Sequence, residues 1–337
     1  MLVVYDELYT EHLRGVAHPE RPDRVVAVAE RLGAAGLFGD RAPARDATDA
    51  ELERVHPHAY LERVKRDVAT VGSHAAGYLS TGDTVIDETS LAVARRAAGG
   101  TLAAMEAAVA GERAAFALVR PPGHHAEPAR GMGFCIFGNA AVAARAFVAT
   151  HGGRALVVDF DYHHGNGTQA AAGEGVSFVS THAFPAYPGT GGPSEQHFAA
   201  NGAIVNVPLP PHAYGTEPFV ATWQRLLPDV AARVRPDLLV VSAGYDYASG
   251  DPVGDLGVAA DPAARALGAL IRETAQTYCN GRAVYCLEGG YDIPTLARAV
   301  EATLRAHDAG VETERADCAA IPARQRTLTD AVAAWVT

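Results

Sequence analysis

Four stretches of the chain share one pattern, an apolar run that ends in a polar, glycine-containing cluster. The runs are AAFALV (114–119), RALVVDFD (154–161), PDLLVVSAG (236–244) and RAVYCLEGG (282–290), and the clusters that end or follow them are RPPGHH, HHGNG, YDYASGD and Tyr291. Near-continuous apolar strands separated by helices are typical of a parallel sheet that is buried on both faces. Ligands of open α/β sheets bind beyond the carboxyl ends of the strands. The pattern therefore predicts an α/β fold in which four loops converge on one site.

The remaining elements complete this α/β interpretation. A first strand is expected at residues 1–5 and a turn at 111–113, and helices are expected at 21–35, 89–110, 139–150, 218–234, 262–279 and 294–307. Asn139 suits the N-cap of its helix, and prolines suit the starts of four others (Pro22, Pro218, Pro262 and Pro294). We find no linker or low-complexity tract, so we expect a single domain over residues 1–337, in which residues 308–337 have no predicted role.

Composition narrows the classes of function. The formal net charge of −11 disfavours nucleic-acid binding, because such proteins usually carry a basic patch. An acidic surface attracts cationic ligands such as lysine side chains or polyamines. The four cysteines are scattered, no signal peptide is visible, and no apolar run approaches about 18 residues. We therefore expect a cytoplasmic protein with reduced thiols that does not enter a membrane; the sequence leaves its oligomeric state open.

The segment DFDYHHGNGT (159–168) predicts a metal site. Asp159, Asp161 and His163 would point the same way if the strand continued. Buried carboxylates this close repel each other unless a cation neutralises them, and Asp and His ligands suit zinc, although Fe(II) accepts the same ligands. Asp246 in SAGYD would complete a set of three ligands and leave one position open for water. The alternatives are a hydrogen-bonded polar turn for the first segment and a helix cap or turn for Asp246.

Two other clusters supply candidates for proton transfer and charge stabilisation. Pro121, Pro122 and Gly123 form a rigid turn that would fix His124 and His125 within reach of a water molecule. Tyr291 follows two glycines, which allow a close backbone approach, and its hydroxyl could donate to a developing oxyanion. The alternatives are surface histidines and a tyrosine buried for packing alone.

Taken together, RPPGHH, DFDYHHGNGTQ, SAGYD and LEGGY, in this order, resemble the motifs of the histone deacetylase family, which has an arginase-like fold. The similarity extends to HPERPDR (18–24), GMGFC (131–135) and YPGTG (187–191), and it covers residues 1–305. The asparagine of HHGNGTQ is similar to the class II branch and its bacterial relatives. The resemblance implies a single-domain α/β fold with a central, mostly parallel sheet and helices on both faces.

The resemblance also implies two metal sites. Asp161, His163 and Asp246 match the family's zinc ligands. A structural potassium site, formed mostly by backbone carbonyls, is implied at Asp159, Asp161, His163, Ser180 and Thr181.

The catalytic roles follow from the same motifs. His125 corresponds to the general base, which later acts as the acid toward the leaving amine, and Asn166 would orient it. An amide polarises a histidine less than a carboxylate does, so His125 should be less basic than in relatives with aspartate. His124 would be an electrostatic helper bonded to Asp159. Tyr291 matches the tyrosine that polarises the substrate carbonyl, where some relatives have histidine and act weakly on acetyl-lysine.

Residues of the substrate tunnel can also be matched. Phe134 and Tyr187 resemble its two aromatic walls, and the Gly133 carbonyl would accept from the substrate amide. Arg24 resembles an arginine of the inner product-release channel. Asp83 is expected at the rim.

One position in the sequence bears on whether the substrate is an acylated lysine or an acetylated polyamine. Relatives that prefer acetylpolyamines carry a glutamate shortly after the third zinc ligand, and Val253 stands at that place here. An apolar residue cannot pair with a distant ammonium group, so the sequence favours acylated lysine. A deacetylase of acetylpolyamines or other small metabolites is the first alternative, and a non-catalytic binder of acyl-lysine is another. An arginase-like hydrolase with two manganese ions would need further DxHxD-type ligands, which we do not find.

Overall fold

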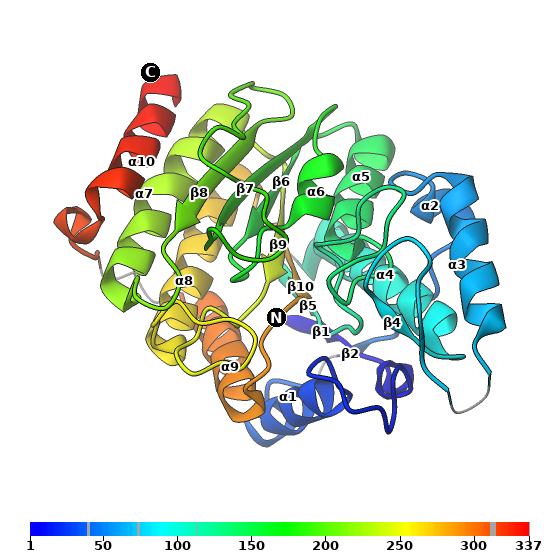
Figure 1. Cartoon of the computed structure of the whole chain (residues 1–337). Coiled ribbons are helices and arrows are strands. Elements are labelled where there is room, and N and C mark those ends of the chain that lie inside the picture. Colours follow the sequence, from blue (N-terminus) through cyan, green and yellow to red (C-terminus); the bar gives the residue numbers. More distant parts are fainter. Residues whose placement is uncertain (39–40, 73–74, 113, 311–314, 337) are drawn as a thin grey trace.

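A parallel sheet of eight strands forms the centre of the computed structural model (Figure 1), which describes residues 1–38, 41–72, 75–112, 114–310 and 315–336. The strand order is β2-β1-β5-β10-β9-β6-β7-β8. The strands are β1 Leu2–Val4, β2 Arg41–Ala42, β5 Ala114–Ala117, β6 Ala155–Asp159, β7 Val176–Ala183, β8 Ile204–Leu209, β9 Leu238–Ala243 and β10 Ala283–Leu287. A separate antiparallel pair consists of β3 (Gly77–Tyr78) and β4 (Val85–Ile86).

The four strands predicted from the apolar runs lie side by side in the middle of the sheet. They are β5, β10, β9 and β6, and every residue in them is buried. Their pairings are all parallel, so their carboxyl ends lie at one edge. The prediction of a parallel sheet buried on both faces is therefore confirmed.

Helices cover both faces of this sheet (Figure 1). The helices are α1 Asp23–Ala34, α2 Asp49–Leu52, α3 His58–Thr70, α4 Ser90–Ala107, α5 Asn139–His151, α6 Asn166–Ala170, α7 Thr216–Val234, α8 Ala260–Tyr278, α9 Ile293–Ala309 and α10 Ala323–Val336. One layer runs α1, α9, α8, α7 and α10, each in contact with the next, and α4 packs with α5 in the other layer. The predicted α/β class is confirmed. Among the described residues, no helix combines the length and apolar character that crossing a membrane requires.

Three local predictions need correction or limits. The strand predicted over 154–161 ends at Asp159, because the amides of Asp161 and Tyr162 donate to the carboxylates of Asp159 and Asp246 rather than to a neighbouring strand. Asn139 is not the N-cap of α5: Gly138 holds that position, and the Asn139 amide instead donates to the Pro121 carbonyl (3.0 Å). The turn predicted at 111–113 corresponds to a kink at Gly111, whose backbone is not helical (φ 132°), within the segment Ala108–Glu112 that follows α4; residue 113 lies outside the described residues.

The C-terminal segment, to which the sequence assigned no role, covers the end of the sheet at β8. Helix α10 packs on α7 and β8, and the Gln325 amide donates to the Pro208 carbonyl (2.8 Å). Trp335 stacks on Phe198, with ring centroids 5.5 Å apart. Because an uncovered edge strand exposes unpaired backbone groups, this helix protects the sheet on that side.

Candidate active site

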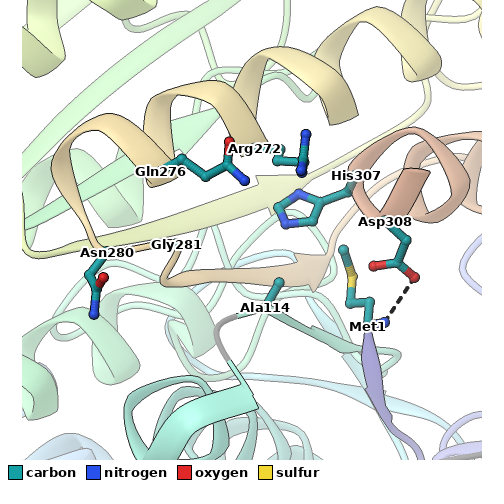
Figure 2. Close-up of a pocket in the computed structure, with 8 residues that line it drawn as sticks. All are labelled: Met1, Ala114, Arg272, Gln276, Asn280, Gly281, His307 and Asp308. Carbon is teal, nitrogen blue, oxygen red and sulfur yellow. Dashed lines mark hydrogen bonds and ion pairs between the residues drawn. The ribbon is translucent and has the colours of Figure 1, made fainter. Parts of the chain in front are cut away.

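The predicted site residues lie in loops at the carboxyl edge of the sheet. Contacts between these loops include His163 with Asp246, the Gly289 amide with Asp161, and Phe134 with Tyr291. The polar hollow of about 260 Å³ in Figure 2 lies elsewhere, at the amino ends of the strands, where Ala114 begins β5. Its lining includes none of the predicted site residues. The predicted site residues therefore gather at the carboxyl edge, which is where parallel sheets bind their ligands.

A buried group of two carboxylates and one imidazole stands at the centre of this edge. Asp161, His163 and Asp246 each offer one ligand atom, and these atoms lie within 4.8 Å of one another. The Nδ1 atom of His163 is 3.1 Å from Asp161 Oδ1 and 2.9 Å from Asp246 Oδ2. Three backbone amides hold the carboxylates in place: the amides of His163 and Gly289 donate to Asp161, and the Tyr162 amide donates to Asp246.

This group fits a metal ion. Asp246 Oδ2 is buried and has no hydrogen-bond partner among the described residues, although it faces His163 Nδ1. Burial, followed by the negative charge of Asp161, raises the pKa of Asp246 to about 7. A divalent cation would relieve that repulsion, and two carboxylates with one imidazole are donors that suit zinc or iron. Asp161, His163 and Asp246 could therefore hold one ion, as the sequence predicted.

A chain of hydrogen bonds determines which ring nitrogen of His125 carries the proton. Its Nδ1 lies 2.8 Å from Asn166 Oδ1, and the Asn166 amide nitrogen donates to Glu127 Oε1 (2.8 Å). Because a carboxylate only accepts, the Asn166 nitrogen must face Glu127 and its oxygen must face His125. Nδ1 of His125 therefore carries the proton, and its Nε2 is left with a lone pair. The sequence had not indicated Glu127, although it stands only two residues after His125.

The pKa values of the adjacent histidines His124 and His125 are shifted in opposite directions. His124 Nδ1 is 3.1 Å from Asp159 Oδ2, and its Nε2 is 3.8 Å from Asp161 Oδ1. Burial lowers the pKa of His124, but the charges of Asp161 and Asp159 outweigh burial and raise it to about 10. Burial, then the positive charges of His124 and His163, hold the pKa of His125 well below its ordinary value. His124 is thus the cation of the pair and His125 the neutral imidazole, an arrangement typical of acid–base sites.

Glu288 holds the RPPGHH turn from the neighbouring strand. Its Oε2 accepts from the Gly123 amide (2.6 Å) and the His124 amide (3.1 Å), and its Oε1 accepts from Ser242 (3.3 Å). The carboxylate is fully buried, and burial raises its pKa to about 7. Sequence reasoning treated Glu288 only as the residue before two glycines, since its partners lie 165 and 46 positions away.

The Tyr291 ring contacts two side chains. It lies edge-on to Phe134, with centroids 5.9 Å apart, and the Arg24 guanidinium carbon stands 4.7 Å from the ring centre. Arg24 also donates to the carbonyls of Glu288 and Gly290. Burial raises the pKa of Tyr291 well above its ordinary value, so the hydroxyl keeps its proton and can donate.

The two aromatic residues predicted for the tunnel contact different parts of the site. The Tyr187 ring lies edge-on to His125 at 5.1 Å between centroids, and Phe134 lies edge-on to His18 at 4.7 Å. Gly133 separates His125 from Tyr187: a Cβ there would stand 2.3 Å from His125 Cδ2 and 2.9 Å from Tyr187 Cε1. Only glycine fits between these two rings.

Asp83 links the two sides of this opening. It accepts from the Gly133 amide through Oδ1 (2.9 Å) and from the Tyr187 hydroxyl through Oδ2 (3.0 Å). The Gly133 carbonyl accepts from the Cys135 thiol (3.3 Å) and keeps a second lone pair for another donor. Tyr187 therefore contributes a polar contact as well as the apolar wall that the sequence predicted.

Three further predicted residues lie nearby. Val253 is partly buried on the loop after β9, where its amide donates to Asp251 (2.9 Å). Ser180 lies on β7, beside Asp159 in the sheet register, and its hydroxyl is 2.9 Å from His182 Nδ1. The Thr181 hydroxyl is buried and has no hydrogen-bond partner among the described residues.

The carboxyl edge of this parallel α/β sheet thus gathers a carboxylate–histidine group, a neutral histidine and a tyrosine hydroxyl, a set that could serve the hydrolysis of an amide. Comparisons with known proteins agree. The family model of the histone deacetylase domain matches residues 18–307. The chain therefore belongs to the histone deacetylase family.

Individual relatives show the extent of the match. The chain is 34% identical over 317 residues to histone deacetylase 15 of Arabidopsis thaliana, which covers 90% of this chain and 56% of that longer protein. It is 38% identical over 284 residues to a histone deacetylase-like amidohydrolase of Pseudomonas aeruginosa, covering 81% of this chain and 72% of that protein. The crystal structure of the HDA15 HD domain superimposes with a TM-score of 0.84 at 31% identity, covering 99% of this chain and 93% of that domain.

Proposed function

We propose that this chain is a zinc-dependent hydrolase that removes acetyl or other short acyl groups from acylated lysine side chains. The observation that carries the proposal is the neutral His125, with its Nε2 lone pair, beside the buried Asp161–His163–Asp246 group. Membership of the histone deacetylase family supports the same reaction.

The three ligands would hold the ion, which, when bound, supplies a Lewis acid for the amide carbonyl and lowers the pKa of a water molecule. Three protein ligands, Asp161, His163 and Asp246, would leave a coordination position open, as a catalytic site requires. Their donor types suit zinc and also admit Fe(II).

His125 moves the proton. Its Nε2 accepts a proton from the attacking water, while Nδ1–H remains bonded to Asn166. The same nitrogen then returns the proton to the amide nitrogen as the C–N bond breaks, so the products are a carboxylic acid and a free amine. Burial, and then the positive charge of His124, which is bonded to Asp159, lowers the pKa of His125 and keeps it unprotonated before the reaction.

Tyr291 stabilises the charge that develops on the carbonyl oxygen. Its phenol stays protonated because burial raises its pKa, so the hydroxyl donates a hydrogen bond at that point. The Gly133 carbonyl would accept from the amide N–H of the substrate and orient it.

The shape of the entrance favours an aliphatic stem. Phe134 and Tyr187 offer aromatic surfaces to methylene groups, and Val253 offers no charge to a distant ammonium group. Acyl-lysine is therefore preferred over acetylated polyamines, which a carboxylate at that position would attract.

A structural potassium ion is part of the same proposal. Asp159 and Ser180 are register partners of adjacent strands, so the carbonyls of Asp159, Asp161, His163 and Thr181 and the Ser180 side chain belong to neighbouring segments. Its support is this proximity together with family membership.

The proposal is tested with purified, zinc-loaded protein on acetyl-lysine peptides and N-acetylspermidine, with released acetate as the product measured. We expect release from the peptides at the higher kcat/KM. Tyr291→Phe should lower kcat by about 10²–10³-fold, because one oxyanion donor is lost, with the zinc content unchanged.

Tyr278→Phe is the matched control, since Tyr278 is the last residue of α8 and lies just before β10 begins, at the edge of the sheet opposite the loops of the site. Full turnover in Tyr291→Phe would remove the catalytic role of Tyr291. Binding of the peptide without any acetate release would identify a non-catalytic binder instead.

A further inference from the structure

A buried carboxylate outside the predicted site anchors the segment that carries Tyr291. Asp251 is only 8% exposed, and its two oxygens accept four backbone amides. Oδ1 accepts from Val253 (2.9 Å) and Gly254 (3.1 Å), and Oδ2 accepts from Tyr291 (2.6 Å) and Asp292 (3.0 Å). With four donors on two oxygens, Asp251 is engaged in binding backbone rather than a metal or a substrate.

The backbone around Tyr291 is fixed on both sides of this anchor. Before it, the Gly289 amide donates to Asp161 Oδ2 (2.8 Å), and the Gly289 carbonyl accepts from the Tyr245 amide (3.0 Å). After it, Asp292 caps α9 by accepting from the Thr295 amide (3.1 Å). Asp251 holds the amides of Tyr291 and Asp292, which flank the Tyr291 Cα and so fix the backbone from which this side chain projects.

The same carboxylate connects two parts of the proposed chemistry. It lies five positions after Asp246, on the loop that also carries Val253, and it reaches 40 positions along the chain to Tyr291. The Asp246 ligand and the Tyr291 hydroxyl are therefore carried by loops that share one anchor. A displacement of either loop by about 1 Å is enough to lower a rate by about 10²-fold.

We propose that Asp251 is a positioning residue that holds Tyr291 in its donating orientation beside the metal ligands by binding the amides of Tyr291 and Asp292. This inference rests on the proposed function, since it acts through the role of Tyr291 there. Asp251 itself touches neither substrate nor reacting atoms.

The test is a double-mutant cycle between Asp251→Asn and Tyr291→Phe on the zinc-loaded chain, with an acetyl-lysine peptide as substrate. The asparagine keeps the shape but turns an NH₂ group toward two of the four amide donors. We expect Asp251→Asn alone to lower kcat by about 10–100-fold with KM within about threefold, because the lost interaction acts in the transition state. In the Tyr291→Phe background the same change should cost less than about threefold, since the hydroxyl it positions is already absent.

Asp255→Asn is the matched control in the same loop. Asp255 accepts from the Gly250 and Gly257 amides (3.1 and 2.6 Å), and none of its hydrogen bonds among the described residues is with Tyr291. We expect its effect on kcat to be small and equal in both backgrounds. Equal, additive losses for Asp251→Asn in the two backgrounds, or the same non-additivity for Asp255→Asn, would overturn the inference.

Two measurements separate failure of this inference from failure of the proposed function. Zinc content and thermal midpoint are recorded for every variant, and Asp251→Glu replaces Asp251→Asn in the cycle if the latter does not fold. Absence of acetate release from the parent, or full activity of Tyr291→Phe, rejects the proposed function. An active parent, an impaired Tyr291→Phe and an additive cycle reject only the role of Asp251.

Discussion

Replacing Gly289 with alanine should disrupt the metal group without removing any ligand. A Cβ at this position would lie 2.5 Å from Asp246 Oδ2 and 2.6 Å from Asp161 Oδ2. The backbone of Gly289 is not left-handed, and alanine keeps the amide that donates to Asp161, so the added methyl group is the whole perturbation.

The size of the effect follows from these distances. Cβ contacts closer than 3.0 Å essentially do not occur, so both oxygens must retreat. The retreat is about 0.5 Å, whereas zinc–ligand distances tolerate only about 0.2 Å. Displacements of this kind in the surroundings of a metal lower its affinity by about 10–100-fold, which corresponds to about 1.4–2.7 kcal/mol.

The assay is zinc content after dialysis against graded free-zinc buffers, followed by acetate release at each zinc concentration. Gly289→Ala should need about 10–100-fold more free zinc than the parent for half-occupancy, and high zinc should restore part of its turnover. Gly33→Ala is the control, because nothing stands within 4 Å of its Cβ and its backbone is not left-handed. Parental zinc affinity and parental turnover in Gly289→Ala would refute the steric reasoning and with it the placement of the ion.

Two further predictions concern specificity and pH. Val253→Glu should shift the ratio of kcat/KM toward N-acetylspermidine over acetyl-lysine peptide, since a carboxylate there attracts a distant ammonium group; an unchanged ratio rejects the assignment of Val253. His56 accepts from the Gly138 amide (2.9 Å), and burial lowers its pKa from 6.5 to about 4. The unfolded chain therefore binds the extra proton first, so the contribution of His56 is complete above pH 6.5 and is lost as the pH falls to 4, in total about 3 kcal/mol. Urea denaturation should show the stability gap between parent and His56→Gln closing over that window, and a gap that stays constant contradicts the assignment.

The sequence determined the central strands and the kinds of side chain at the site. Runs such as AAFALV and RALVVDFD are buried because contiguous apolar residues specify a strand covered on both faces, and that information is local. The same locality placed Asp161, His163 and Asp246 just past strand ends. Parallel pairing then brings any residues at those ends to one edge.

The search for apolar runs did not predict strands in which polar residues interrupt the apolar pattern. Strand β7, VSFVSTHA, is fully buried although it carries serine, threonine and histidine side chains. Their polar groups are accommodated by contacts such as that of the Ser180 hydroxyl with His182, so burial there did not require an apolar run. Asn139 failed as a cap for a related reason, because a distant carbonyl, that of Pro121, took its side chain.

Only the tertiary structure decided which groups hold the site residues in place. Glu127 fixes Asn166 from 39 positions away, Glu288 fixes the Gly123–His124 turn from 165 and 164, and Asp251 fixes Tyr291 from 40. The residues next to each of these three carboxylates in the sequence do not indicate its partner. The function of each carboxylate depends on which amide donors the packed loops present to it, and that depends on how the helices set the loops against one another rather than on the residues beside it in the chain.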